Sequence, residues 1–133
     1  MPRLASVLLV DDDPTANFLH RLLLTRLDVA ERIVVVTDGQ QALDALRQPP
    51  APPALILLDL NMPVLNGFEF LARYPAALPA GAARPVVALL SSSEQALDQA
   101  RHLPADAYLT KPLTHEKVTA LLTQYFADAP AGT

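Results

Sequence analysis

The chain has 133 residues, of which 51% are hydrophobic and 18% are charged, and these values predict one compact domain rather than two. Ten lysine and arginine residues stand against fourteen acidic residues, which gives a net charge of −4. This charge argues against direct binding of nucleic acid, because a protein that follows a phosphate backbone needs a basic surface. The absence of cysteine excludes disulfides, thiolate zinc sites and a cysteine nucleophile.

The longest apolar stretches, such as residues 7–10 and 54–58, are far shorter than the ~18 residues that a membrane-spanning helix needs. A short apolar run lies near the N-terminus, but three aspartates follow it where a signal peptide would need a longer core and a cleavage site. We therefore expect a soluble, cytoplasmic protein that does not associate with membranes.

Five short runs rich in valine, isoleucine and leucine recur along the chain and predict β-strands. They are residues 6–10, 32–36, 55–58, 86–90 and 107–110. The first, third and fourth runs are apolar throughout, which is typical of strands that are covered on both faces. Arg32 and Thr37 indicate that the second strand is less buried.

The segments between these runs are amphipathic and long enough for helices. Pro14 is suited to the first turn of the first helix, which ends near Asp28. Its predicted apolar stripe consists of Phe18, Leu19, Leu22, Leu23 and Leu27. Two further helices are predicted from residue 39 to about 47 and from 67 to about 74, followed by a loop rich in alanine and proline over residues 75–84.

A fourth helix is capped from within residues 91–95 and ends near His102, and Thr114 caps a fifth. The core-facing residues of that fifth helix are Val118, Leu121, Leu122, Tyr125 and Phe126. The alternation predicts an α/β fold of the (βα)5 type, a doubly wound, flavodoxin-like parallel sheet of five strands in the order 2-1-3-4-5. We expect residues 1–133 to form a single domain with a core of about 6–126 and a short tail over 127–133.

Four aspartates lie directly after strand ends: Asp11, Asp12 and Asp13 after the first strand, and Asp59 after the third. In a sheet of this order the ligand site lies outside the carboxyl ends of strands one and three, so these carboxylates should converge. Carboxylates ~4 Å apart repel one another by about 4 kcal/mol at an effective dielectric constant of about 20, so the cluster needs a cation. Hard oxygen ligands without histidine or cysteine favour Mg²⁺.

Ser91 and Lys111 end the two remaining strands of the predicted site. A hydroxyl and an ammonium group that face carboxylates and Mg²⁺ suit the transfer of a phosphoryl group. Asp59 is preferred as the nucleophile because it stands alone, whereas an adjacent acidic pair is better suited to hold a metal ion.

Several of these residues also have a purely structural interpretation. Asp13 before Pro14 is most simply a helix N-cap, Ser91 could cap a helix, and Lys111 could lie in a solvated turn. The three histidines lack metal-ligand spacing and are expected in surface or capping roles; they are His20, His102 and His115. The phenylalanines, Tyr74 and Tyr125 are expected in or near the core, with Tyr108 as an exception.

The motif residues, taken together, resemble a response-regulator receiver domain of two-component signalling, and the resemblance runs from about residue 6 to 126. They are Val10-Asp11-Asp12, Leu58-Asp59 with Met62-Pro63 and Gly67, Ser91, and Tyr108-Leu109-Thr110-Lys111-Pro112. The resemblance implies a CheY-like, stand-alone receiver whose partners are a sensor histidine kinase or histidine phosphotransfer protein and a downstream target protein. It implies signalling through a changed surface and not turnover of a diffusible substrate.

The resemblance also assigns roles to individual residues. Asp59 would accept the phosphoryl group, and Asp12 and Asp59 would bind Mg²⁺ through their side chains, with Asp11 acting chiefly through water and the Asn61 backbone carbonyl completing the protein ligands. Lys111 would pair with the phosphoryl group, and the Lys111-Pro112 bond would be cis. Ser91 and Tyr108 would form the switch that reshapes the face of the fourth helix, fifth strand and fifth helix.

Two alternatives remain. Asp11 to Thr15 contain the D-x-D-x-T pattern of haloacid-dehalogenase-type phosphatases, in which Asp11 would be the nucleophile; the segment 112–116 after Lys111 lacks the acidic pair that this family needs. The chain could also be a receiver-like interaction module that is not phosphorylated. Ser91, where threonine is frequent, and the 75–84 loop depart from the commonest receiver pattern.

Overall fold

The computed structural model describes residues 3–47, 52–60 and 66–126. Five parallel strands form one sheet in the order β2-β1-β3-β4-β5, as predicted. The strands are β1 (Leu4–Val10), β2 (Ala30–Val36), β3 (Leu55–Asp59), β4 (Val86–Ser91) and β5 (Ala107–Thr110). The helices are α1 (Pro14–Arg26), α2 (Gly39–Leu46), α3 (Gly67–Ala77), α4 (Glu94–Ala100) and α5 (His115–Phe126). The fold is therefore the doubly wound (βα)5 arrangement.

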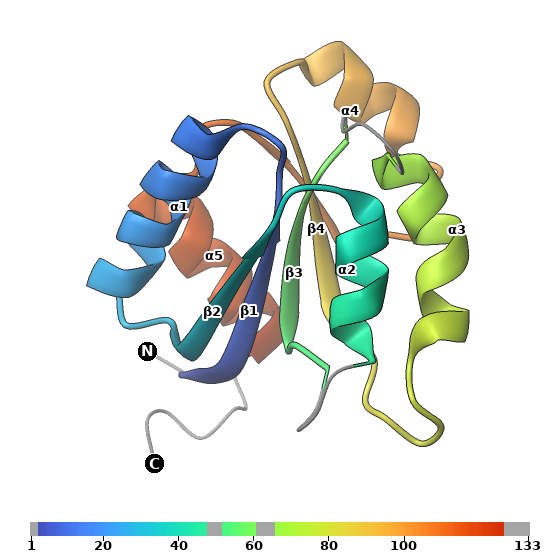
Figure 1. Cartoon of the computed structure of the whole chain (residues 1–133). Coiled ribbons are helices and arrows are strands. Elements are labelled where there is room, and N and C mark those ends of the chain that lie inside the picture. Colours follow the sequence, from blue (N-terminus) through green and yellow to red (C-terminus); the bar gives the residue numbers. More distant parts are fainter. Residues whose placement is uncertain (1–2, 48–51, 61–65, 127–133) are drawn as a thin grey trace.

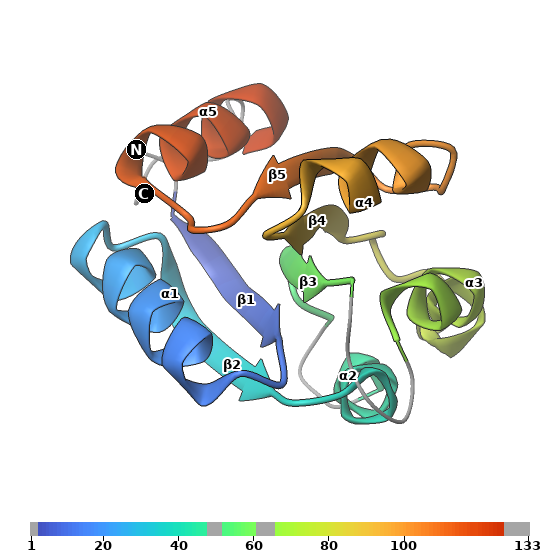
Figure 2. The same cartoon turned by 90° about the horizontal axis from the view of Figure 1, so that it is seen from above.

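The helices cover both faces of the sheet: α1 and α5 lie on one face, and α2, α3 and α4 lie on the other (Figures 1 and 2). Alternate residues of β1 enter opposite cores, since Leu9 packs with residues of α1 and α5 and Leu8 packs with residues of α2 and α3. β1, β3 and β4 are buried almost throughout, whereas β2 at the sheet edge is half-buried or exposed. Both burial predictions are confirmed.

The predicted apolar face of α1 is wrong in part. Phe18, Leu19 and Leu22 are 66%, 53% and 37% exposed. The buried residues of this helix are Asn17, His20 and Leu24, with Leu23 and Leu27 half-buried. Asn17 and His20 face the polar groups at the end of β1. The side of α1 that packs against the sheet is therefore partly polar, and three apolar side chains are exposed to solvent.

Two other expectations need correction. His20 is only 5% exposed, so its expected surface or capping role is wrong, and Phe18 and Phe68 (39% exposed) are not core residues. The helix α3 continues through Pro75 to Ala77 instead of ending near Tyr74. Proline removes one backbone hydrogen bond from a helix, but burial of Tyr74 and Ala77 on the same helix offsets that loss.

Candidate functional site

The turn after β1 is fixed by hydrogen bonds before α1 begins. The Asp11 carboxylate accepts the Asp13 backbone N–H at 2.9 Å, and Asp13 accepts the Thr15 N–H at 3.0 Å. Asp13 is thus the N-cap of α1, as predicted. From inside α1, the Asn17 amide donates to the Asp11 backbone carbonyl at 2.7 Å in a buried hydrogen bond. These hydrogen bonds fix the path of the backbone through Asp11 and Asp13 between β1 and α1.

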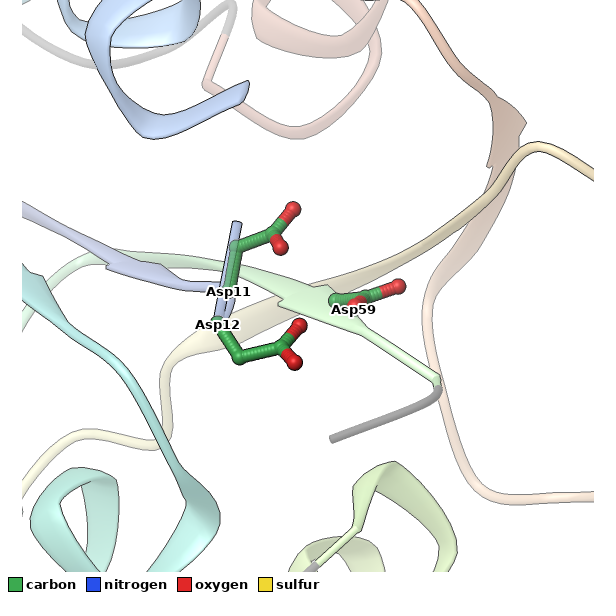
Figure 3. Close-up of side chains that lie close together, drawn as sticks. All are labelled: Asp11, Asp12 and Asp59. Atoms are coloured by element: carbon green, nitrogen blue, oxygen red, sulfur yellow. The ribbon is translucent and has the colours of Figure 1, made fainter. Parts of the chain in front are cut away.

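The structure brings the three predicted carboxylates together at the carboxyl end of the sheet. Asp11 and Asp12 follow β1 and Asp59 ends β3, and their side chains point into a common space (Figure 3). One carboxylate oxygen from each lies within 4.8 Å of the others. Asp11 and Asp59 are buried, while Asp12 is exposed. Such a group can hold one hard divalent cation, with Asp12 open to solvent.

Lys111 reaches this cluster from the segment after β5. Its ammonium donates to Asp11 Oδ2 at 2.6 Å and lies 3.4 Å from Asp59 Oδ1. Burial by itself would lower the pKa of Lys111, but the hydrogen bond to Asp11 and the attraction of Asp59 outweigh burial, so the pKa lies above the usual lysine value. Lys111 therefore stays charged and forms the cationic side of the site.

The backbone around the cluster is closely packed. The Lys111-Pro112 peptide bond is cis, as predicted. Gly67 begins α3 directly beside the end of β3, where an added Cβ would lie 2.9 Å from the Asp59 backbone oxygen and 3.0 Å from the Leu60 Cα. A side chain at Gly67 would push this backbone aside. Asn61, whose carbonyl was predicted as a metal ligand, lies outside the described residues.

The two predicted switch residues lie on neighbouring strands. Ser91 ends β4, is 2% exposed, and its hydroxyl accepts the Ser93 backbone N–H at 3.1 Å. Ser93, and not Ser91, is the N-cap of α4. Tyr108 on β5 donates its hydroxyl to the Leu103 carbonyl at 2.6 Å and lies 3.1 Å from the Arg101 carbonyl. The Tyr108 ring is thus held at the segment between α4 and β5.

Sequence reasoning missed Asn17 and His20, which line the same end of the sheet. Burial lowers the pKa of His20, and the nearby Lys111 charge lowers it further, although Asp11 and Asp13 act in the opposite direction. His20 is thus kept neutral beside Lys111. Asn17 and His20 are three residues apart, a spacing that places both on one side of a helix and could have indicated a buried polar side. The apolar residues on the other side of α1 formed a stronger pattern and led to the wrong prediction of the buried face.

Comparison with known proteins agrees with this geometry. Residues 7–123 match the family described as "Response regulator receiver domain". The chain is 29% identical over 124 residues to the "Two-component response regulator ORR41" of Oryza sativa subsp. japonica, a match that covers 92% of this chain and 95% of the relative. Within the described residues, no helix is long and apolar enough to cross a bilayer.

Solved structures give the same result. The bacteriophytochrome response regulator AtBRR is 30% identical, with a TM-score of 0.79 and 92% of each chain covered. The receiver domain of sensor histidine kinase PA1611 from Pseudomonas aeruginosa PAO1, solved with a magnesium ion coordinated in its active site cleft, is 28% identical, with a TM-score of 0.73 and coverage of 92% of this chain and 98% of that one. These matches decide against the phosphatase alternative. The chain belongs to the response regulator receiver domain family, whose members are signalling proteins of two-component systems.

Proposed function

We propose that Asp59 accepts a phosphoryl group from the phosphohistidine of a sensor histidine kinase or a histidine phosphotransfer protein. The observation that carries this proposal is the position of Asp59 within one cluster of carboxylates that also holds the Lys111 ammonium. An Asp59 oxygen would bond to phosphorus while the bond from phosphorus to the histidine nitrogen breaks, and the imidazole would leave with the bonding electron pair. The product is an aspartyl phosphate.

The contacts of Asp11 suit a supporting, electrostatic role for this carboxylate. Asp11 already accepts the Lys111 ammonium at 2.6 Å and the Asp13 N–H at 2.9 Å, so its oxygens are occupied by strong donors. Lys111 lies farther from Asp59, at 3.4 Å. This distance places the ammonium where it can pair with the oxygens of a phosphoryl group on Asp59.

The donor set fits Mg²⁺ as the cofactor. Asp12 and Asp59 would bind the ion through their carboxylates, Asp11 chiefly through water, and the Asn61 carbonyl would complete the protein ligands. Three carboxylates face one ammonium, and this surplus of negative charge supports a divalent cation with oxygen ligands. When bound, Mg²⁺ supplies positive charge that stabilises the oxygens of the transferring phosphoryl group.

The output is a change of surface at α4, β5 and α5. A phosphoryl oxygen on Asp59 would attract the Ser91 hydroxyl away from the Ser93 N–H, and the segment after β4 would move with it. Tyr108 would then leave its carbonyl partner at Leu103 and turn inward. A small movement at the site would thereby select a second arrangement of the surface, which binds a downstream protein.

The surface beside the site supports a protein as phosphodonor. Phe18, Leu19 and Leu22 expose apolar side chains on α1, the helix that begins three residues after Asp11. An exposed apolar patch next to a reactive group is suited to docking a protein. We also propose that the protein catalyses no reaction on a diffusible substrate, does not bind nucleic acid directly and is cytoplasmic. These statements, and the organisation of residues 1–133 as one domain, stay predictions.

The proposal is tested by incubating the protein with Mg²⁺ and acetyl phosphate and measuring its intact mass. We expect one added phosphoryl group that is labile to acid and to hydroxylamine, and no addition to Asp59→Asn. Asp12→Asn, which removes a carboxylate that would bind Mg²⁺, should be phosphorylated far more slowly.

Two outcomes would contradict the proposal. A phosphoryl group retained in Asp59→Asn and lost in Asp11→Asn would place the nucleophile on β1. No phosphorylation of the wild-type protein by acetyl phosphate or by a panel of purified histidine kinases would favour the module that is not phosphorylated.

A further inference from the structure

The chain contains only two lysines, Lys111 and Lys117, whereas its other eight basic residues, histidines aside, are arginines. Lys111 directly follows β5, and Lys117 is the third residue of α5. Lys111 contacts the carboxylates of the site, whereas Lys117 has no role in the proposed phosphorylation. Lys117 is half-buried in the first turn of α5. Its contacts differ from those of a solvated surface charge.

The Lys117 ammonium makes three hydrogen bonds, and all three go to neutral oxygens on the two residues that flank Lys111. It donates to the Thr110 carbonyl at 2.7 Å, to the Thr110 hydroxyl at 3.0 Å and to the Pro112 carbonyl at 3.1 Å. An ammonium has three donors and no acceptor, so these bonds use its full donor capacity. The Lys117 side chain is therefore folded back over the chain on both sides of Lys111.

The backbone of Lys111 itself is held by the neighbouring strand β4. Its N–H donates to the Ser91 carbonyl at 2.9 Å, which attaches it to the end of β4. On the α5 side, the Lys117 backbone N–H donates to the Thr114 hydroxyl at 3.2 Å, which fixes the turn from which the Lys117 side chain extends. Lys111 is thus held between β4 and α5, and its side chain is left to extend toward Asp11 and Asp59.

We propose that Lys117 is a positioning residue for Lys111: by holding the carbonyls of Thr110 and Pro112, it fixes the backbone that presents the Lys111 ammonium to the acidic site. This inference rests on the proposed role of Lys111 in the phosphorylation site. A charged donor is suited to the task because hydrogen bonds from an ammonium to a carbonyl are stronger than bonds between neutral groups. Lys117 itself does not contact the carboxylates that react.

The two lysines allow a direct measurement, because protein labelled with ¹⁵N-lysine contains only two side-chain ammonium groups. We expect the Lys111 ammonium of the wild-type protein to exchange its protons slowly with water, as befits its buried ion pair. In Lys117→Met, which keeps an unbranched apolar chain but loses the charge, this exchange should become about tenfold faster. Phosphorylation by acetyl phosphate should slow by about tenfold, the size expected for losing a hydrogen bond to a charged group.

Matched variants separate positioning from a general loss of stability. Arg73→Met removes an exposed cation from α3 and should leave both rates unchanged. Lys117→Arg keeps the charge and should restore most of both rates. In a Lys111→Met background, adding Lys117→Met should not slow phosphorylation further, whereas a purely structural role would add a second loss. If Lys117→Met does not fold, the same measurements on Lys117→Gln, which keeps one donor group, decide the question.

The proposal is wrong if Lys117→Met or Lys117→Gln leaves the exchange of the Lys111 ammonium and the phosphorylation rate at wild-type values. It is also wrong if the loss persists in full in the Lys111→Met background. If the wild-type protein is not phosphorylated at all, the proposed function fails, and the exchange measurement still decides whether Lys117 positions Lys111.

Discussion

The ion pairs at the carboxyl end of the sheet and those on the outer helices are made of similar groups in opposite surroundings. Lys111 and Asp11 are 2.6 Å apart, with side chains 19% and 4% exposed. Arg101 at the C-cap of α4 and Asp98 within this helix are 3.1 Å apart, with side chains 60% and 71% exposed. Arg47 and Asp44, also in solvent, are 3.7 Å apart. Of these three pairs, the buried one has a cation that is shared by two carboxylates, because Lys111 also lies 3.4 Å from Asp59.

The difference shows where the fold accepts an energetic cost. Exposed ion pairs contribute only about 0–1 kcal/mol, because water already solvates both groups. Buried charges lose hydration worth several kcal/mol each, which their mutual attraction barely repays. An apolar cluster would stabilise this end of the sheet at least as well. We therefore attribute the charges at Asp11, Asp59 and Lys111 to the proposed phosphorylation and not to stability.

The largest expected effect comes from adding a divalent cation to the carboxylate cluster. Mg²⁺ at a hundredfold excess over its dissociation constant should stabilise the wild-type protein by about 2.7 kcal/mol, since it binds only the folded cluster. Asp12→Ala should lose this gain. Thermal unfolding with and without Mg²⁺, with Ca²⁺ as a second cation, measures it; a melting temperature indifferent to millimolar Mg²⁺ would contradict the metal site.

The next effect comes from breaking the buried ion pair. Lys111→Met should lower the free energy of unfolding by about 2 kcal/mol without Mg²⁺, because it removes a charged hydrogen bond from Asp11 and leaves Asp11 and Asp59 facing each other without a cation. Since the folded pKa of Lys111 is raised, its stabilisation persists through neutral pH and is lost only as pH rises through that raised value. Urea unfolding at pH 7.5 and at alkaline pH measures this loss. Equal stability of both proteins at pH 7.5 would show that the pair contributes nothing.

A smaller effect should separate His20 from the two exposed histidines. Because the folded pKa of His20 is lowered, the unfolded chain takes up a proton first as pH falls below about 6.5, and the folded state loses stability from there downward. His20→Gln should flatten this loss between pH 7.5 and 5.5 in urea unfolding. His115→Gln is the matched control and should retain it; identical slopes in all three proteins would remove His20 from the acid response.

The smallest effect is expected at the exposed pairs. Arg47→Ala should change the free energy of unfolding by no more than about 0.5 kcal/mol, and a double-mutant cycle with Asp44→Ala should give a coupling of similar size. A coupling energy above about 1.5 kcal/mol would show that the exposed pairs stabilise the fold as strongly as a buried pair can, and would contradict the comparison.

Much of the fold and of the acidic site could be predicted from local sequence, because strands, caps and strand ends each depend on neighbouring residues. Uniformly apolar runs predicted buried strands, Asp13 before Pro14 predicted an N-cap, and aspartates directly after strands predicted an acidic cluster. The end of α3 could not be predicted in this way. Pro75 is a local stop signal, and the burial of Tyr74 and Ala77 that overrides it depends on distant parts of the chain.

By itself, the sequence determined the (βα)5 order, the positions of the strands and the residues that gather at their carboxyl ends, since hydrophobic runs and the aspartates after them are local properties of the chain. Only the tertiary structure decided which side of α1 faces inward and which carboxylate lies nearest to the Lys111 ammonium. The rotation of α1 follows from the polar end of β1 against which Asn17 and His20 pack. The hydrogen bond between Lys111 and Asp11 joins residues that are 100 positions apart in the sequence, so no local sequence pattern could predict it.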